Sequence, residues 1–324
     1  MSIDSKTFYQ RVVSDWLCVD VVGAKLGGKV LSCSDEWFAA AENLISPGEP
    51  IRDKTRFTYA GAWYDGWETR RHNEEPYDWV IMRLGPVAAR IAGCEVDTAF
   101  FDGNHAPAIS VDAIYSDSDD LDENDKKWQE VIGKNECGPS TKQFFINDKL
   151  TSDRFTHVKL KMYPDGGIAR LRLFGRVEPP LKLESTTDLA SSLNGGVAID
   201  RSDQHFGSAD NLLLPGRGKD MSDGWETKRS RVKGHTDWVV VQLGKQSRRI
   251  DKIVVDTAHF RGNFPQFVKV EGTGPSGSLE LVPLTKTGPD KEHKFDIGKD
   301  YQIDTVKLTL VPDGGVKRLR VFGL

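Results

Sequence analysis

Two short segments with the same residue types are the strongest candidates for chemistry in this sequence. Each places a tryptophan directly before a glutamate and an arginine three residues after it. Glutamate can serve as a general acid or base, and arginine offers two parallel N–H donors that match a carboxylate. The alternative is structural: tryptophan fills a core and glutamate accepts backbone hydrogen bonds in a turn. The residues are Trp67, Glu68 and Arg71 in the first segment and Trp225, Glu226 and Arg229 in the second.

Other polar residues also occur in pairs at matching places. The further candidates for binding are Asp35 with Asp203 and Asn104 with Asn263. Carboxylate and amide oxygens accept from N–H groups, and the amide nitrogen also donates to carbonyl groups. Each of the two asparagines follows a glycine, and Gly-Asn is also a common turn. Both interpretations of these residues therefore stay open.

All of these residues belong to one long repeat, which must position them. The segment Asp65–Arg71 returns as Asp223–Arg229, an offset of 223 − 65 = 158, and Val96–Ala99 returns as Val255–Ala258, an offset of 255 − 96 = 159. This period far exceeds the roughly 20–50 residues of solenoid repeats and propeller blades. Each copy is therefore a whole domain, and a chain of 324 residues has room for two.

Changes in the offset locate insertions in the first copy. The offset is 196 − 28 = 168 at Gly28 but 306 − 158 = 148 at Val158. The first copy therefore carries extra residues around 51–64 and around the acidic stretch 116–125. Insertions favour surface loops, and we expect the acidic stretch to be solvated rather than a cation site. The predicted organisation is an N-terminal arm over 1–19, repeats over 20–176 and 188–324, and a linker over 177–187.

Strand patterns dominate both copies. Residues 79–84 and 238–243 are mostly apolar and stop before a glycine, and residues 305–310 alternate with period two. Turn signals such as Pro312–Gly315 separate these runs, and one or two helical turns are expected within 35–44. The sequence predicts an all-β protein of two antiparallel β-sandwiches that arose by internal duplication.

Composition narrows the class of partner and the compartment. The formal net charge is −4, and no apolar run reaches the roughly 18 residues of a membrane span. We therefore expect neither nucleic acid nor a membrane as a partner. The N-terminus lacks the basic-then-apolar order of a signal peptide. The cysteines form no Cys-x-x-Cys pair, which favours reduced thiols in the cytoplasm over a zinc site or disulfides. They are Cys18, Cys33, Cys94 and Cys137.

No common catalytic motif, such as Gly-x-Ser-x-Gly or His-Glu-x-x-His, occurs in the chain. The chain nevertheless resembles the allantoicase family over nearly its whole length and in both repeats. The resemblance rests on Ser34–Phe38, Gly66–Arg71, Asp78–Val80, Asn211–Gly218, Val255–Phe260 and Gly262–Pro265. It implies two tandem jelly-roll sandwiches of the galactose-binding type, a homo-oligomer, and hydrolysis of allantoate to ureidoglycolate and urea in purine degradation.

The chemistry of allantoate assigns expected roles to the paired residues. Allantoate carries a carboxylate and two ureido groups on one carbon, so the arginines suit the carboxylate and the carboxamides and aspartates suit the ureido groups. Glu68 and Glu226 are the candidates for catalytic acid or base. We favour the first copy as the active one, because its extra loop carries Arg52 and Arg56. The expected substrate-binding residues are Arg71, Arg229, Trp67, Trp225, Asn104, Asn263, Asp35 and Asp203.

Two further points stay open at this stage. Metal ions are associated with the family's activity, but the chain has no cluster of His and Cys ligands, so the cofactor and any metal are unknown. The alternative function is a non-catalytic, lectin-like tandem module that only binds a small molecule.

Overall fold

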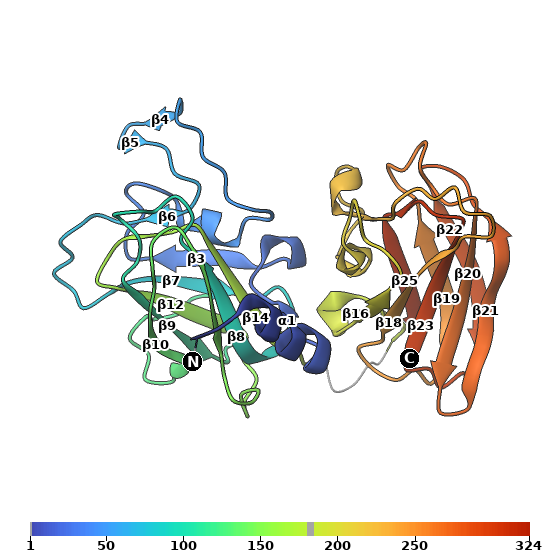
Figure 1. Cartoon of the computed structure of the whole chain (residues 1–324). Helices are drawn as coiled ribbons and strands as arrows, with labels where there is room; N and C mark the ends of the chain where they lie inside the picture. Colours follow the sequence, from blue (N-terminus) through green and yellow to red (C-terminus); the bar gives the residue numbers. More distant parts are fainter. Residues whose placement is uncertain (1, 180–184) are drawn as a thin grey trace. The chain divides into compact units, whose positions relative to one another are not determined.

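A computed structural model describes residues 2–179 and 185–324 (Figure 1). Contacts divide the chain into two units, Met1–Glu178 and Pro179–Leu324. Part of the linker predicted over 177–187 lies outside the described residues. Each unit is built from two antiparallel sheets that enclose a core, so the prediction of an all-β protein with two tandem β-sandwiches is confirmed. In the described part, no helix is long and apolar enough to cross a membrane.

The first unit is a sandwich of two five-stranded sheets. The order in one sheet is β1 (Ser2–Ile3), β11 (Lys142–Ile146), β8 (Ala89–Asp97), β14 (Arg170–Val177) and β2 (Val19–Asp20). The order in the other is β10 (Gln129–Glu136), β9 (Ala108–Ile114), β12 (His157–Tyr163), β7 (Asp78–Arg83) and β3 (Lys29–Cys33). Two short ladders lie outside these sheets: β6 (Trp67–Glu68) with β13 (Gly167–Ile168), and β4 (Phe57–Thr58) with β5 (Gly61–Ala62).

The second unit repeats this order, except that its described residues include no counterpart of β1. One sheet runs β15 (Thr187–Asp188), β25 (Arg318–Gly323), β19 (Ile250–Asp256) and β22 (Glu292–Lys299). The other runs β16 (Val197–Arg201), β18 (Asp237–Gln242), β23 (Thr305–Val311), β20 (Phe267–Gly274) and β21 (Gly277–Lys286). The small ladder of β17 (Trp225–Glu226) with β24 (Gly315–Val316) corresponds to β6 with β13. Internal duplication therefore extends to the ladder that carries each candidate glutamate.

Helical segments are short. The first unit has α1 (Ser5–Tyr9), a π-helical turn η1 (Gln10–Asp15) and the 3₁₀ turns η2 (Ala24–Leu26) and η3 (Ala41–Ile45). The second has the 3₁₀ turns η4 (Ser192–Asn194), η5 (Ala209–Leu213) and η6 (Met221–Asp223). The helical turn expected within 35–44 is thus η3, and it begins at Ala41.

Alternating side chains explain why these strands form sandwiches. In β7, Val80 and Met82 point inward and are fully buried, and Val239 and Val241 do the same in β18. Burying such a side chain contributes about 1.5–3 kcal/mol to folding. The two cores are separate clusters, one in each unit.

The N-terminal arm covers the outer face of one sheet in the first unit. Phe8 and Val12 are fully buried against Phe144 and Phe174 of β11 and β14. The ring centroids of Phe8 and Phe144 are 5.3 Å apart. The segment before the repeat is therefore an integral part of this unit.

The two insertions of the first copy have different structures. Residues around 51–64 form a hairpin, β4 with β5, that projects from the sandwich in Figure 1. Residues 115–128 connect β9 to β10 and fold back over the outer face of their sheet. There, Lys159 donates to the carbonyl of Glu123 at 2.7 Å and lies 4.9 Å from the centre of the Trp128 ring. Residues 117–120 remain exposed, as expected for a solvated loop.

Candidate active site

Glu68 and Glu226 occupy equivalent places at one end of their sandwiches. Glu68 pairs with Gly167 in the β6–β13 ladder, and Glu226 pairs with Gly315 in the β17–β24 ladder. A Cβ atom on Gly167 would overlap the ring of buried Phe101. The Asp-Gly-Gly turn therefore needs glycine there, because the backbone of β13 lies directly against that ring.

Trp67 and Trp225 are fully buried beneath these glutamates. The indole N–H of Trp67 donates to the carbonyl of Asp35 at 2.7 Å, and that of Trp225 donates to the carbonyl of Asp203 at 2.9 Å. Both tryptophans thus fill the cores and orient the ladder, and neither presents surface to a ligand in this structure. This is the structural role that the sequence left as an alternative.

Each glutamate is paired with the predicted asparagine of its own copy. The amide nitrogen of Asn104 donates to Oε1 of Glu68 at 2.6 Å, and Asn263 donates to Oε1 of Glu226. Glu68 is 8% exposed. Burial raises the pKa of Glu68, while the hydrogen bond from Asn104 and the charges of Arg71 and Arg52 oppose this shift. A carboxyl group of this kind holds its proton at higher pH than an exposed glutamate does.

The arginines of the two copies are held differently. Nη1 of Arg71 forms an ion pair with Asp165 at 2.9 Å, and Nη2 donates to the carbonyl of Gly103 at 3.2 Å. Nη2 of Arg229 donates to the carbonyl of Gly262 at 3.4 Å, and no carboxylate of the described residues lies within ion-pair distance of Arg229. The guanidinium of Arg71 therefore has more protein partners than that of Arg229.

Asp35 and Asp203 bind the segment that follows each glutamate. Oδ2 of Asp35 accepts from the backbone N–H of Arg70 at 2.7 Å, and Oδ2 of Asp203 accepts from that of Lys228 at 2.7 Å. The side chain of Arg70 also forms an ion pair with Asp35 at 3.0 Å. These contacts give the aspartates a positioning function in both copies.

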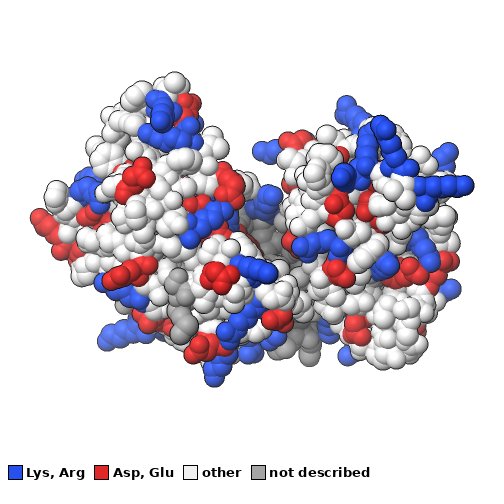
Figure 2. Space-filling view, in the orientation of Figure 1, with Lys and Arg blue, Asp and Glu red and all other residues white. Residues whose placement is uncertain are grey.

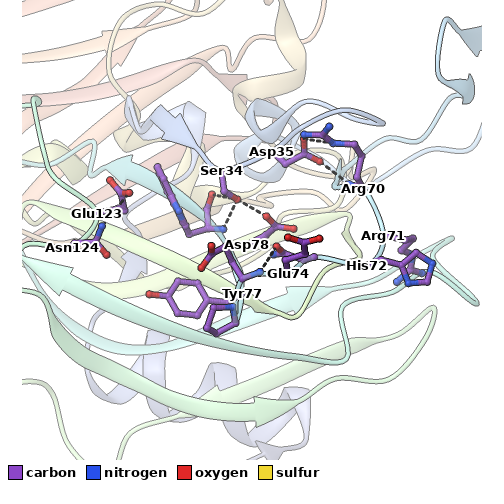
Figure 3. Close-up of a pocket in the computed structure, with 14 residues that line it drawn as sticks. Ser34, Asp35, Arg70, Arg71, His72, Glu74, Tyr77, Asp78, Glu123 and Asn124 are labelled. Atoms are coloured by element: carbon purple, nitrogen blue, oxygen red, sulfur yellow. Dashed lines mark hydrogen bonds and ion pairs between the residues drawn. The ribbon is translucent and has the colours of Figure 1, made fainter.

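A cavity of about 1000 Å³ lies beside the site in the first unit (Figure 3). Asp35 and Arg71 line it, whereas Glu68 and Asn104 do not. Arg71 thus lines this cavity, and its charge also acts on Glu68. The remaining walls include the loop of His72 to Tyr77 and, from the second insertion, Glu123 and Asn124.

The structure adds polar residues that were not selected from the sequence. Asp78 lines the cavity and accepts from the hydroxyl of Ser34 at 2.7 Å, and Asp237 accepts from Ser202 at the same distance in the second copy. Burial raises the pKa of Asp78. The signal was available, because Ser34 and Asp78 both recur in the repeat, but a recurring residue does not reveal its partner.

The surroundings of the two sites carry different charges. The loop after Glu226 contains Lys228, Arg229, Arg231 and Lys233, whereas that after Glu68 contains Glu74 and Glu75 as well as its arginines. In Figure 2, Lys and Arg side chains gather at the upper end of the second unit, while charges of both signs are mixed on the first. The copies have therefore diverged around a common pair of residues.

Among residues 2–179 and 185–324, no three His, Cys, Asp or Glu side chains are arranged to hold a metal ion. The four cysteines are free thiols, and three of them are buried.

The fold and the site define a class: a duplicated β-sandwich protein with an equivalent Glu–Asn pair in each sandwich. The model of the allantoicase repeat matches residues 19–178 and 187–324, and the chain therefore belongs to the allantoicase family. It is 60% identical to allantoicase from Saccharomyces cerevisiae, with 99% of this chain and 98% of the relative covered. It is 53% identical to allantoicase from Neurospora crassa, over 94% of this chain and 90% of the relative.

Solved structures agree with this assignment. The crystal structure of allantoicase from Saccharomyces cerevisiae is similar to this chain with a TM-score of 0.92 and 58% identity. The match covers 100% of this chain and 99% of the solved one. The family resemblance seen in the sequence is thereby confirmed.

Proposed function

We propose that this protein is an allantoicase-type hydrolase that converts allantoate and water to ureidoglycolate and urea in purine degradation. Relatives named allantoicase match the chain from end to end, which supports this activity. The observation that carries the proposal is the buried Glu68, held by Asn104 next to the guanidinium of Arg71. The relatives are named as enzymes, so the lectin-like alternative is not favoured.

The reaction breaks a bond between the central carbon of allantoate and one ureido nitrogen. The departing urea needs a proton, and a water molecule must lose one. A glutamate whose pKa is raised by burial retains a proton at higher pH and can donate it to the leaving nitrogen. The resulting carboxylate, stabilised by the N–H of Asn104, can then accept a proton from water. Glu68 can thus serve both steps.

Arg71 supplies the group that suits the substrate carboxylate. Its side chain is 38% exposed, so the guanidinium is accessible from the cavity. Two of its five N–H donors are used by Asp165 and Gly103, which leaves three for a ligand. The amide of Asn104 and the acidic walls of the cavity suit ureido N–H and C=O groups.

The first copy is the one that we propose to be active. Its guanidinium is fixed by an ion pair, and its extra loop brings Arg52 close enough to act on Glu68. In the second copy, the corresponding loop contains Arg217, which contacts the sandwich itself. Arg217 forms two hydrogen bonds with Asp256, at 2.7 and 2.9 Å. Glu226 and Arg229 are therefore proposed to have a supporting role.

Two further features remain proposals. Four free cysteines suit a reducing compartment and support a cytoplasmic location. The exposed apolar side chains on and beside the β4–β5 hairpin, including Phe57 and Tyr59, support assembly into a homo-oligomer. Light scattering of the purified chain measures the latter directly.

The direct test is release of urea from allantoate by the purified protein. We expect turnover of allantoate but not of allantoin, which is cyclic and lacks the free carboxylate. The matched control is the Glu68→Gln variant, which preserves shape and removes the proton-transfer group. Binding of allantoate without release of urea by the wild-type protein would support the non-catalytic alternative and reject the hydrolase.

A further inference from the structure

Asp165 connects two parts of the loop that follows Glu68. It lies in the turn between β12 and β13 and is only 4% exposed. Its Oδ1 accepts from Nη1 of Arg71 at 2.9 Å, and its Oδ2 accepts from the backbone N–H of Asn73 at 3.1 Å. One carboxylate thus holds residue 71 by its side chain and residue 73 by its backbone.

The backbone between these two contacts has an unusual conformation. His72 has a φ of 64°, in the left-handed region that side chains other than glycine seldom adopt. This conformation turns the N–H of Asn73 towards Oδ2 of Asp165 and leaves Oδ1 for Arg71. The side chain of Asn73 adds a hydrogen bond to the carbonyl of Pro164 at 3.1 Å. The loop is therefore built around the turn that carries Asp165.

The second copy has the same aspartate but not the same arrangement. Oδ2 of Asp313 accepts from the backbone N–H of Ser230 at 2.7 Å, one residue after the arginine instead of two. The loop is one residue longer there, since 237 − 229 = 8 whereas 78 − 71 = 7. Ser230 has no left-handed φ, and Asp313 forms no ion pair with Arg229. The turn aspartate thus holds the arginine in the copy with the shorter loop and not in the copy with the longer one.

The contacts of Arg71 continue to the glutamate. Its Nη2 donates to the carbonyl of Gly103, whose neighbour Asn104 donates to Glu68. Fixing the guanidinium therefore also fixes the loop that presents Asn104. The distances along this path, 2.9, 3.2 and 2.6 Å, are all within hydrogen-bonding range.

We propose that Asp165 is a positioning residue that orients Arg71 for the carboxylate of the substrate, and that Asp313 has no such role in the second copy. This inference rests on the proposed function. Asp165 does not touch the ligand itself; it directs the free N–H donors of Arg71. The short loop of the first copy is what makes this orientation possible.

A competing effect makes the proposal falsifiable. Asp165 also neutralises part of the charge of Arg71, and removal of a neutralising carboxylate alone would strengthen the binding of an anion. Removal of a positioning group weakens it instead, because a guanidinium that is free to rotate must be ordered on binding. The two effects predict opposite changes in KM.

The experiment uses the full chain with Asp165→Asn and, as the matched control, Asp313→Asn. We expect KM for allantoate to rise about tenfold in Asp165→Asn, the change that corresponds to losing roughly 1.4 kcal/mol of binding, with a smaller change in kcat. Asp313→Asn is expected to leave both constants unchanged. A KM that is unchanged or lower in Asp165→Asn, or an equal rise in both variants, would overturn the proposal.

A second variant keeps Asp165 intact. One glycine inserted between Arg71 and His72 gives the first loop the length of the second, and it is expected to raise KM as Asp165→Asn does. A normal KM in this variant contradicts the proposed role of loop length.

A readout without substrate separates this proposal from the enzymatic one. In thermal unfolding, Asp165→Asn and Arg71→Met should be non-additive, because each removes one charge of the same ion pair; additive effects would reject the ion pair. If the wild-type protein releases no urea, the proposed hydrolase activity is rejected. The double-mutant cycle still tests the contact between Asp165 and Arg71 in that case. An active wild type with a normal Asp165→Asn variant refutes only the role of Asp165.

Discussion

Asn104 donates its amide N–H to Oε1 of Glu68 at 2.6 Å, although 36 residues separate them in the chain. Asn263 makes the same contact with Glu226 across 37 residues. A neutral amide donor stabilises the ionised carboxylate, whereas burial stabilises the protonated form. In the first copy burial is the larger of these two effects, so the pKa of Glu68 is raised.

The first prediction concerns the two glutamates. Glu68→Gln should lower kcat for release of urea by about 10²–10⁴, as expected for the loss of an acid–base group, because glutamine cannot exchange a proton. Glu226→Gln should have a much smaller effect, and steady-state assays of both variants check this. If Glu226→Gln abolishes turnover and Glu68→Gln does not, the assignment of the copies is wrong; if neither matters, the glutamates are structural.

The second prediction concerns pH. The pKa of Glu68 already lies above its usual range because of burial, and Asn104 opposes that shift. Asn104→Leu removes the opposing hydrogen bond and should raise the pKa of Glu68 further. If protonated Glu68 is the acid, kcat falls as pH rises through this pKa, so the alkaline limb of the pH–rate profile should move to higher pH. Asn263→Leu is the control; a limb that moves to lower pH would exclude Glu68 as the acid.

The third prediction concerns recognition of the carboxylate. Arg71→Lys keeps the charge but loses the planar pair of donors. A hydrogen bond to a charged group contributes roughly 1.5–3 kcal/mol, so affinity for allantoate should fall at least tenfold. Arg229→Lys should change it less. Unchanged kinetics in both single variants and in the double variant would remove the arginines from the site.

The fourth prediction concerns stability. Gly167→Ala should destabilise the first unit by about 1–3 kcal/mol, the usual effect of overpacking a core, because the new methyl group overlaps the ring of Phe101. Gly103→Ala is the control, since no atom lies within 4 Å of a Cβ there. Chemical denaturation measures both. Equal stability of the two variants would mean that the β13 backbone can move away from the ring.

Much of the fold could be predicted from the sequence because it depends on local, repeated patterns. The offset of the repeat, the alternation of residues 305–310 and the Asp-Gly-Gly turns are all readable along the chain, and they lead to β23 and the β13 and β24 ladders. The packing of the N-terminal arm could not be predicted in this way. Phe8 and Val12 are buried against Phe144 and Phe174, which lie on strands far away in the sequence.

The site was harder to predict, because its contacts join residues that are far apart in sequence. Repetition identified Glu68, Asn104 and Arg71 as candidates, but not that Asn104 contacts Glu68. The sequence does not distinguish Asp165 from an ordinary turn residue, since Pro-Asp-Gly-Gly is a common turn. Asp165 forms its ion pair with Arg71 in the copy whose loop is one residue shorter. The alternation of apolar and polar residues along the chain does not predict a contact of this kind.

The connection between β9 and β10 suggests a use for the second unit. At this place the first copy has residues 115–128, whereas the second has only the turn between Gly274 and Gly277. Two sandwiches with the same strand order thus tolerate very different lengths of chain at one corner. The turn of the second unit is therefore a natural point at which to insert a peptide tag or a reporter domain.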